Sequence, residues 1–227
     1  MDYKGKYFSV LGDSVSTLSG YSQPDFAAFY DTEHKLLSGV LTPSDTWWGQ
    51  VIDALQGRLL VNNSFSGSTV CKLPGYEIES YGCSDERTGA LHRDGLTPDV
   101  IMVYIGTNDW GRGLAPVPTE QAQNGDRSVF SEAYRCMLEK LKKNYPAAEI
   151  WCFTLAVSKP AEGETFPYCY AGRHMDAYCN VIRDLAQAYD CRLVDLYRCA
   201  APYETIDGFH PDARGMQTLS RAVLSRI

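Results

Sequence analysis

The stretch Tyr7-Phe8-Ser9-Val10-Leu11-Gly12-Asp13-Ser14 decides the fold that we expect for this chain of 227 residues. A short apolar run ends abruptly in Gly12-Asp13-Ser14, which is typical of a buried strand that presents a serine hydroxyl at the edge of a sheet. The same triplet also occurs in ordinary turns. Its meaning therefore depends on what the rest of the chain supplies to a serine nucleophile.

Five apolar runs predict strands, and most of them are continuous rather than alternating, as expected for a sheet covered on both faces. Apolar residues at helical spacing lie between these runs, and Pro211 fits the first position of the last helix. Strands that alternate with helices predict a parallel sheet in an α/β fold. The expected strands are 7–11, 58–62, 99–105, 149–155 and 192–196, and the expected helices are 47–55, 85–91, 130–141, 178–189 and 216–227.

Three long polar stretches, 15–44, 110–127 and 156–174, each follow a predicted strand. They are therefore expected at the carboxyl edge of the sheet, where open α/β folds bind ligands. Loops of this length in a compact domain are more often functional than idle. Internal repeats, low-complexity segments and linkers are absent from the sequence, so residues 1–227 are expected to form one domain.

Composition and the first residues of the chain indicate which kinds of partner and which cellular compartment to expect. The 21 basic and 28 acidic side chains give a net charge of −7, which disfavours nucleic acid as a partner. No apolar run approaches the roughly 20 residues that span a bilayer. Residues 1–6 lead directly into the first strand and leave no room for a signal peptide, so we expect a cytoplasmic protein. The eight cysteines lack a Cys-x-x-Cys pair and are interpreted as reduced thiols.

The turn Asp207-Gly208-Phe209-His210 supplies what a serine nucleophile needs most, a base. A carboxylate three residues before a histidine on a tight turn can accept a hydrogen bond from the imidazole Nδ1–H, which leaves Nε2 facing the serine. The residues therefore predict a catalytic triad of Ser14, His210 and Asp207.

Two other stretches offer hydrogen-bond donors for the oxyanion that forms during acyl transfer. Gly67 lies in a polar loop after the second strand, where a glycine lets a backbone N–H approach a substrate closely. Asn108 follows the third strand and brings an amide side chain to the same edge. With the N–H of Ser14, these residues predict three donors.

The chain resembles the SGNH (GDSL-type) hydrolase superfamily, because four short motifs follow in that family's order. They are Gly12-Asp13-Ser14, Ser66-Gly67, Gly106-Thr107-Asn108-Asp109 and Asp207-x-x-His210. The resemblance implies a flavodoxin-like three-layer α/β/α sandwich with a five-stranded parallel sheet. It also implies ester hydrolysis without metal or cofactor, with the roles assigned above. One departure is that the family's common Gly-Asp-Ser-Leu reads Gly-Asp-Ser-Val here.

The neighbours of these motifs are the possible substrate contacts. Trp110 directly follows Asn108-Asp109 and is expected at the pocket, as is Asp13, for which we also weigh a structural role in supporting the loop. Aromatic residues of the first long stretch could either bind a sugar or acyl group or pin the loop down. These are Tyr21, Phe26, Phe29 and Tyr30. The pair His174 and Asp176 lacks the dense ligand spacing of a metal site.

These observations predict a serine esterase that acts on small acyl or acetyl esters. An acetylated carbohydrate and a lysophospholipid or other lipid ester both stay open as substrates. Acyl transfer to another alcohol would use the same residues, and a non-catalytic binding module could share the scaffold. Because free imidazole titrates near ~6.5, activity is expected to fall at acidic pH as His210 becomes charged.

Overall fold

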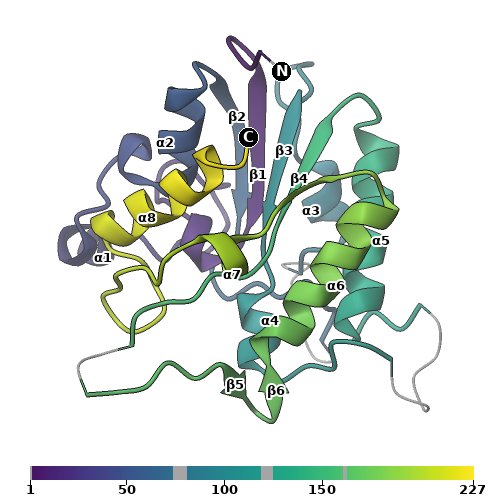
Figure 1. Ribbon diagram of the computed structural model, residues 1–227. Coiled ribbons are helices and arrows are strands. Elements are labelled where there is room, and N and C mark those ends of the chain that lie inside the picture. Colours follow the sequence, from purple (N-terminus) through teal and green to yellow (C-terminus); the bar gives the residue numbers. More distant parts are fainter. Residues whose placement is uncertain (1, 74–80, 119–124, 161–162) are drawn as a thin grey trace.

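Five parallel strands form the central sheet, in the order β2-β1-β3-β4-β7 (Figure 1). The computed structural model describes residues 2–73, 81–118, 125–160 and 163–227. The strands of the sheet are β1 (Tyr7–Gly12), β2 (Arg58–Ser64), β3 (Val100–Tyr104), β4 (Glu149–Phe153) and β7 (Arg192–Val194). All five predicted strands are present, and their order is that of flavodoxin-like folds.

Helices cover both faces of this sheet, as Figure 1 shows. One face packs against α2 (Trp47–Ala54) and α8 (Ala213–Leu224), and the other against α5 (Phe130–Asn144) and α6 (Met175–Ala188). The arrangement is the predicted three-layer α/β/α sandwich. The shorter helices are α1 (Thr32–Ser38), α3 (Asp85–Gly89), α4 (Thr107–Gly111) and α7 (Leu196–Cys199), with 3-10 turns η1 (Ser14–Ser16) and η2 (Pro43–Asp45).

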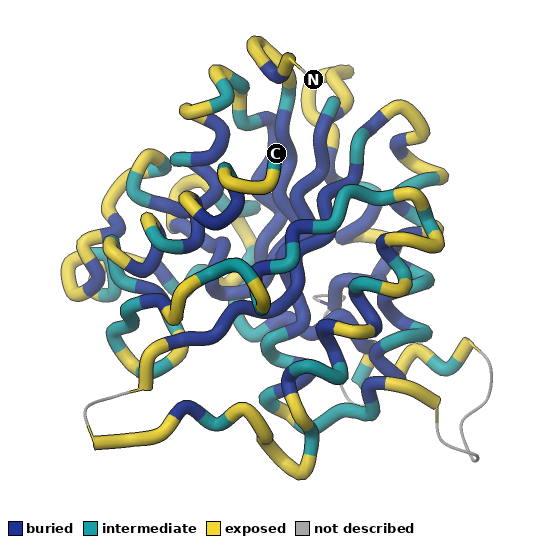
Figure 2. Tube along the Cα trace, viewed as in Figure 1, coloured by how far each residue is buried: buried dark blue, intermediate teal, exposed yellow. Residues whose placement is uncertain are grey.

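Strand β3 explains why the apolar runs are continuous. Its residues Met102 and Tyr104 belong to the core under α2 and α8, whereas Ile101 and Val103 belong to the core under α5 and α6. Successive side chains of a strand point to opposite faces, so a strand covered on both faces buries every residue. Figure 2 shows the strands buried along most of their length, with the exposed residues on the outer helix faces and loops.

The long stretches after the strands contain structure that apolar periodicity does not predict. The stretch 15–44 includes η1 and α1, and 156–174 includes a hairpin of β5 (Cys169–Tyr170) and β6 (Arg173–His174). Parts of two predicted stretches, residues 119–124 and 161–162, lie outside the described residues. The last helix begins at Ala213 with Asp212 as its N-cap, so the prediction of Pro211 at the first helical position is wrong. The Asp212 side chain accepts a hydrogen bond from the Gly215 N–H. This N-cap makes the helix begin two residues later than expected.

Within the described part of the chain, no helix has both the length and the apolar character required to cross a membrane.

Candidate active site

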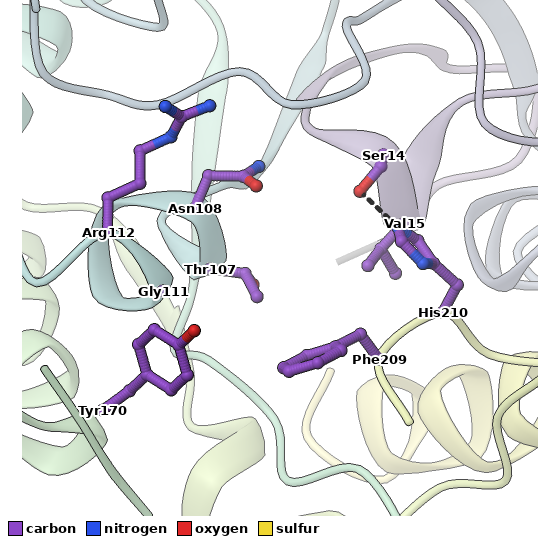
Figure 3. Close-up of a pocket in the computed structure, with 9 residues that line it drawn as sticks. All are labelled: Ser14, Val15, Thr107, Asn108, Gly111, Arg112, Tyr170, Phe209 and His210. Carbon is purple, nitrogen blue, oxygen red and sulfur yellow. Dashed lines mark hydrogen bonds between the residues drawn. The ribbon is translucent and has the colours of Figure 1, made fainter. Parts of the chain in front are cut away.

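A continuous hydrogen-bond chain joins Ser14, His210 and Asp207 at the carboxyl edge of the sheet. The Nε2 atom of His210 lies 2.9 Å from Ser14 Oγ, as drawn in Figure 3, and Nδ1 lies 2.6 Å from Asp207 Oδ2. Ser14 begins η1 and is separated from the end of β1 by Asp13 alone. The structure thus brings together the three residues predicted as the triad, although Ser14 and His210 are 196 positions apart.

Gly12 allows the sharp exit from β1 that presents Ser14. A Cβ atom at this position would lie 2.7 Å from Ser16 Cβ and 2.9 Å from Ser64 Oγ, closer than real Cβ contacts. The chain therefore turns tightly under the serine only because residue 12 has no side chain. Asp13 then caps η1, with its Oδ1 accepting from the Val15 N–H at 3.2 Å.

The Asp207 carboxylate holds the turn that carries the histidine. Its Oδ1 accepts the N–H groups of Phe209 and His210 at 2.9 and 2.7 Å, and its Oδ2 faces the imidazole. Partial burial acts to raise the pKa of Asp207, but hydrogen bonds from the His210 ring and from these N–H groups lower it to about 2. Asp207 is therefore ionised at neutral pH, and an ionised acceptor favours the imidazole tautomer with its proton on Nδ1.

The aromatic residues of stretch 15–44 support the histidine from the other side. The ring of Phe29 stacks on the His210 imidazole with a centroid distance of 3.4 Å and an interplanar angle of 11°. The buried Tyr30 hydroxyl donates to the Pro211 carbonyl at 2.7 Å. The sequence left two roles open for these aromatic residues, binding a sugar or acyl group or fixing the loop. The contacts of Phe29 and Tyr30 match the second role, because they fix the loop against the turn that carries His210.

Both predicted oxyanion residues lie at the same edge. Gly67 has a φ of 80° in a turn closed by the Ser68 N–H and the Phe65 carbonyl, a conformation that favours glycine. Asn108, in α4, donates one amide hydrogen from Nδ2 to the Ser68 carbonyl at 2.9 Å. An amide group carries two N–H donors, so a second stays available. Figure 3 shows this amide extending towards Ser14.

A cavity of about 350 Å³ opens beside Ser14 and His210 (Figure 3). Its rim includes two aromatic side chains from distant segments, Tyr170 of β5 and Phe209 of the C-terminal turn, which are 45% and 41% exposed. The complete lining is Ser14, Val15, Thr107, Asn108, Gly111, Arg112, Tyr170, Phe209 and His210.

Neither Asp13 nor Trp110 lines this cavity, contrary to the expectation from sequence. Trp110 is fully buried, stacks on Phe166 and donates its indole N–H to the Arg173 carbonyl at 3.1 Å. Helix α4 turns this side chain inward, whereas Thr107, Asn108 and Gly111 face the cavity. Asp13 is 1% exposed, and burial raises its pKa to about 7.

Some cavity residues had signals in the sequence. Phe209 lies inside the predicted Asp207–His210 turn, and Arg112 is one helical turn beyond Asn108. Tyr170 had no such signal, because its hairpin lies in a polar stretch without periodicity. Asp109 has the loop-supporting role expected of it, since its carboxylate accepts the Val70 and Cys71 N–H groups at 2.8 and 3.0 Å. Burial nevertheless raises the pKa of Asp109 to about 6.

The cysteines, all within the described residues, are free thiols. Among the residues with described positions, no group of three or more His, Cys, Asp or Glu side chains is arranged to hold a metal ion.

Comparisons with known proteins identify the family of this chain. A family model described as GDSL-like Lipase/Acylhydrolase matches residues 6–165. A candidate GDSL-like lipase from Bacteroides ovatus has a similar structure, with a TM-score of 0.73, 26% identity and coverage of 98% of this chain and 97% of that chain. A second one, from Bacteroides uniformis, has a TM-score of 0.72, 29% identity and coverage of 98% and 95%.

A more distant solved structure is Est24, a carbohydrate acetylesterase from Sinorhizobium meliloti. It shares the fold with a TM-score of 0.65 at 14% identity, over 97% of each chain. The search of curated proteins finds no significant match. Since the family model spans most of the sequence, the chain belongs to the GDSL-like lipase/acylhydrolase family and is an ester hydrolase.

Proposed function

We propose that this ester hydrolase cleaves small acyl or acetyl esters through a covalent acyl-enzyme, with Ser14 as nucleophile, His210 as base and Asp207 as the residue that orients the base. One observation carries the proposal. His210 Nδ1 donates to Asp207 Oδ2 at 2.6 Å and Ser14 Oγ donates to His210 Nε2 at 2.9 Å, so the three side chains form one relay. Both distances lie within the range for a functional nucleophile and base.

In the first half of the reaction, Ser14 Oγ attacks the ester carbonyl while His210 Nε2 takes the hydroxyl proton. The carbonyl oxygen becomes an oxyanion, which accepts hydrogen bonds from the N–H groups of Ser14 and Gly67 and from the Asn108 amide. The ionised Asp207 stabilises the imidazolium that forms. His210 then gives its proton to the leaving alcohol, and the acyl group stays on Ser14.

In the second half, a water molecule takes the place of the alcohol. His210 removes a proton from the water as it attacks the acyl carbonyl, and the same donors bind the second oxyanion. Collapse of this intermediate breaks the bond to Ser14 Oγ, which regains its proton from His210. The acid is released and the hydroxyl is restored.

The size of the cavity supports a small substrate. Its volume of about 350 Å³ lies near the lower end of the usual ligand pockets, roughly 300–1,000 Å³. Acetylated carbohydrates are included in this proposal because the exposed rings of Tyr170 and Phe209 could pack against a sugar face. The fold shared with the S. meliloti carbohydrate acetylesterase is compatible with that choice.

A fluorophosphonate probe and a panel of p-nitrophenyl esters test the proposal. The probe should label the wild-type protein once per chain, and Ser14→Ala should abolish both labelling and turnover. Acetate and butyrate esters should be hydrolysed faster than palmitate esters. A preference for the long chain would overturn the small-substrate assignment in favour of lipid esters.

The same assay separates the remaining alternatives. Added alcohols that divert most of the acyl group from water would indicate an acyltransferase. A folded wild-type protein that resists the probe would contradict the role of Ser14 and favour a binding module.

A further inference from the structure

A buried arginine that takes no part in the proposed reaction lies directly beneath the site. Arg87, in α3, is 0% exposed and is one of the largest fully buried side chains among the described residues. Removing a cation from water is unfavourable unless several oxygens accept its hydrogens. The positions of those oxygens therefore indicate what Arg87 does.

The guanidinium bridges the ends of two neighbouring strands. Its Nη2 donates to the Gly12 carbonyl at 2.7 Å and to the Asn63 carbonyl at 2.9 Å, while Nε donates to Asn63 Oδ1 at 2.6 Å. Gly12 ends β1 two residues before Ser14, and Asn63 is near the end of β2. Arg87 therefore fixes the backbone that leads to the Ser14 N–H.

The same group also holds the loop that carries Gly67. Its Nη1 donates to Ser68 Oγ at 2.8 Å, and the Ser68 carbonyl accepts the Asn108 amide at 2.9 Å. Ser68 thus accepts a hydrogen bond from Arg87 at its side-chain hydroxyl and another from Asn108 at its backbone carbonyl. Through these contacts Arg87 connects all three segments that supply the oxyanion donors.

The geometry requires an arginine rather than any cation. A planar guanidinium donates in several fixed directions, whereas a lysine ammonium acts as a compact point charge. Burial lowers the pKa of Arg87 to about 9, with the nearby Asp13 acting to raise it, so the group stays charged at neutral pH. The Phe26 ring covers it at 5.5 Å from the ring centroid.

We propose that Arg87 is a positioning residue for the oxyanion hole, which sets the relative placement of the Ser14, Gly67 and Asn108 donors. The inference rests on the proposed function, because these donors act only if Ser14 is the nucleophile. An oxyanion hole depends on donors held in advance where charge develops, so a shift in their spacing lowers the rate more than it lowers substrate affinity.

Kinetics of Arg87→Lys test this role against a matched control, Arg183→Lys. Arg183 lies in α6 and also makes several short contacts, with Asp195 and Asp176 both at 2.8 Å, but it is not part of the cavity lining. For p-nitrophenyl acetate, Arg87→Lys should lower kcat by about 10- to 10³-fold with KM changed less than about threefold. Affinity for a trifluoromethyl ketone, which forms a tetrahedral adduct, should fall in parallel. Arg183→Lys should change kcat, KM and the affinity for the trifluoromethyl ketone by no more than about twofold.

A second variant covers the case in which Arg87→Lys does not fold. Ser68→Ala removes one acceptor of the guanidinium and should lower kcat about tenfold, with a matching loss of affinity for the trifluoromethyl ketone. Rates are expressed per active site titrated with fluorophosphonate, so a loss of folded protein is not counted as a loss of kcat.

Two results would overturn the inference in distinguishable ways. If Ser14→Ala abolishes activity but Arg87→Lys and Ser68→Ala keep wild-type kcat per titrated site, only the role of Arg87 is wrong. If Ser14→Ala is fully active, the proposed function fails and the Arg87 inference fails with it.

Discussion

At the scale of single residues, Asp207 determines which nitrogen of the His210 ring carries the proton. It accepts from Nδ1 at 2.6 Å and also holds the His210 backbone N–H at 2.7 Å. The backbone contact orients the turn, whereas the ring contact selects the tautomer. The two contributions can be separated by replacing the carboxylate with an amide of the same shape.

Asp207→Asn should lower kcat by about 10²–10⁴-fold, because a neutral amide can present its N–H₂ group to the ring and stabilises the imidazolium poorly. The amide oxygen can still accept the backbone N–H groups, so the melting temperature should change little. Steady-state kinetics with p-nitrophenyl acetate and thermal denaturation measure the two effects. A variant with wild-type kcat would contradict the role of Asp207.

Phe29→Leu should lower kcat about threefold to tenfold, since an aromatic pair contributes about 0.5–1.5 kcal/mol and the stacked ring restricts the imidazole. Tyr21→Leu is a control from the same stretch, because Tyr21 is 46% exposed and does not line the cavity. The measurement is kcat per titrated active site. Equal values for the two variants would show that the stacking does not support the base.

The positions of single residues were predictable where a motif follows a strand, and were not predictable where burial decides. Ser14 and Asn108 could be placed at the sheet edge because parallel strands deliver their following residues to one edge, and His210 could be placed from its tight turn with Asp207. Arg87 could not, since nothing in the sequence shows that the ends of β1 and β2 converge on its guanidinium. Trp110 was assigned to the cavity from its position alone, but the helix turns its indole into the core.

At the scale of elements, the long polar stretches build the walls of the cavity. The β5–β6 hairpin contributes Tyr170, and the C-terminal turn contributes Phe209 from the opposite side (Figure 3). These walls come from segments with little regular structure, whereas the residues of the proposed triad lie in short turns at the edge of the sheet. Changes in the hairpin should therefore affect substrate binding more than the chemical step.

Tyr170→Ala should raise KM for aryl esters about 3- to 10-fold, because the ring contributes contact area to the cavity. The change in kcat should be smaller. Tyr168→Ala is the matched control, as Tyr168 is also a tyrosine of this segment, is 48% exposed and does not line the cavity. Initial rates over a range of ester concentrations give both constants. A KM raised equally by the two variants would contradict the assignment.

The strands and main helices were predictable from sequence because burial imposes a clear apolar period on them. Helix α1 was missed for the opposite reason, since Leu36 and Leu37 are 77% and 65% exposed and form no inward stripe. Its ends did carry signals. Asp31 caps the first turn, and Gly39 ends the helix with a φ of 74°.

At the scale of the whole molecule, two buried carboxyl groups next to the site make the free energy of unfolding depend on pH. Burial raises the pKa of Asp13 to about 7 and that of Asp109 to about 6, each from 3.8. A carboxyl group with a raised pKa binds its proton more tightly in the folded state. Its favourable contribution is therefore complete below pH 4 and is lost as pH rises through the folded-state pKa.

The free energy of unfolding should consequently fall between pH 5 and pH 8. For Asp13, a rise from 3.8 to about 7 corresponds to about 4 kcal/mol over the full window. Urea denaturation at the two pH values measures the difference, and Asp13→Asn should reduce it while Asp184→Asn, at an exposed position in α6, should not. Stability that rises from pH 5 to pH 8 in the wild type would contradict this.

The distance of 196 positions between the proposed nucleophile and its base has a consequence during biosynthesis. The ribosome makes Ser14 early and His210 late, so a nascent or prematurely terminated polypeptide carries the serine without an imidazole to activate it. Under the proposed assignment, ester hydrolysis therefore begins only after the turn that carries His210 has docked beside Ser14.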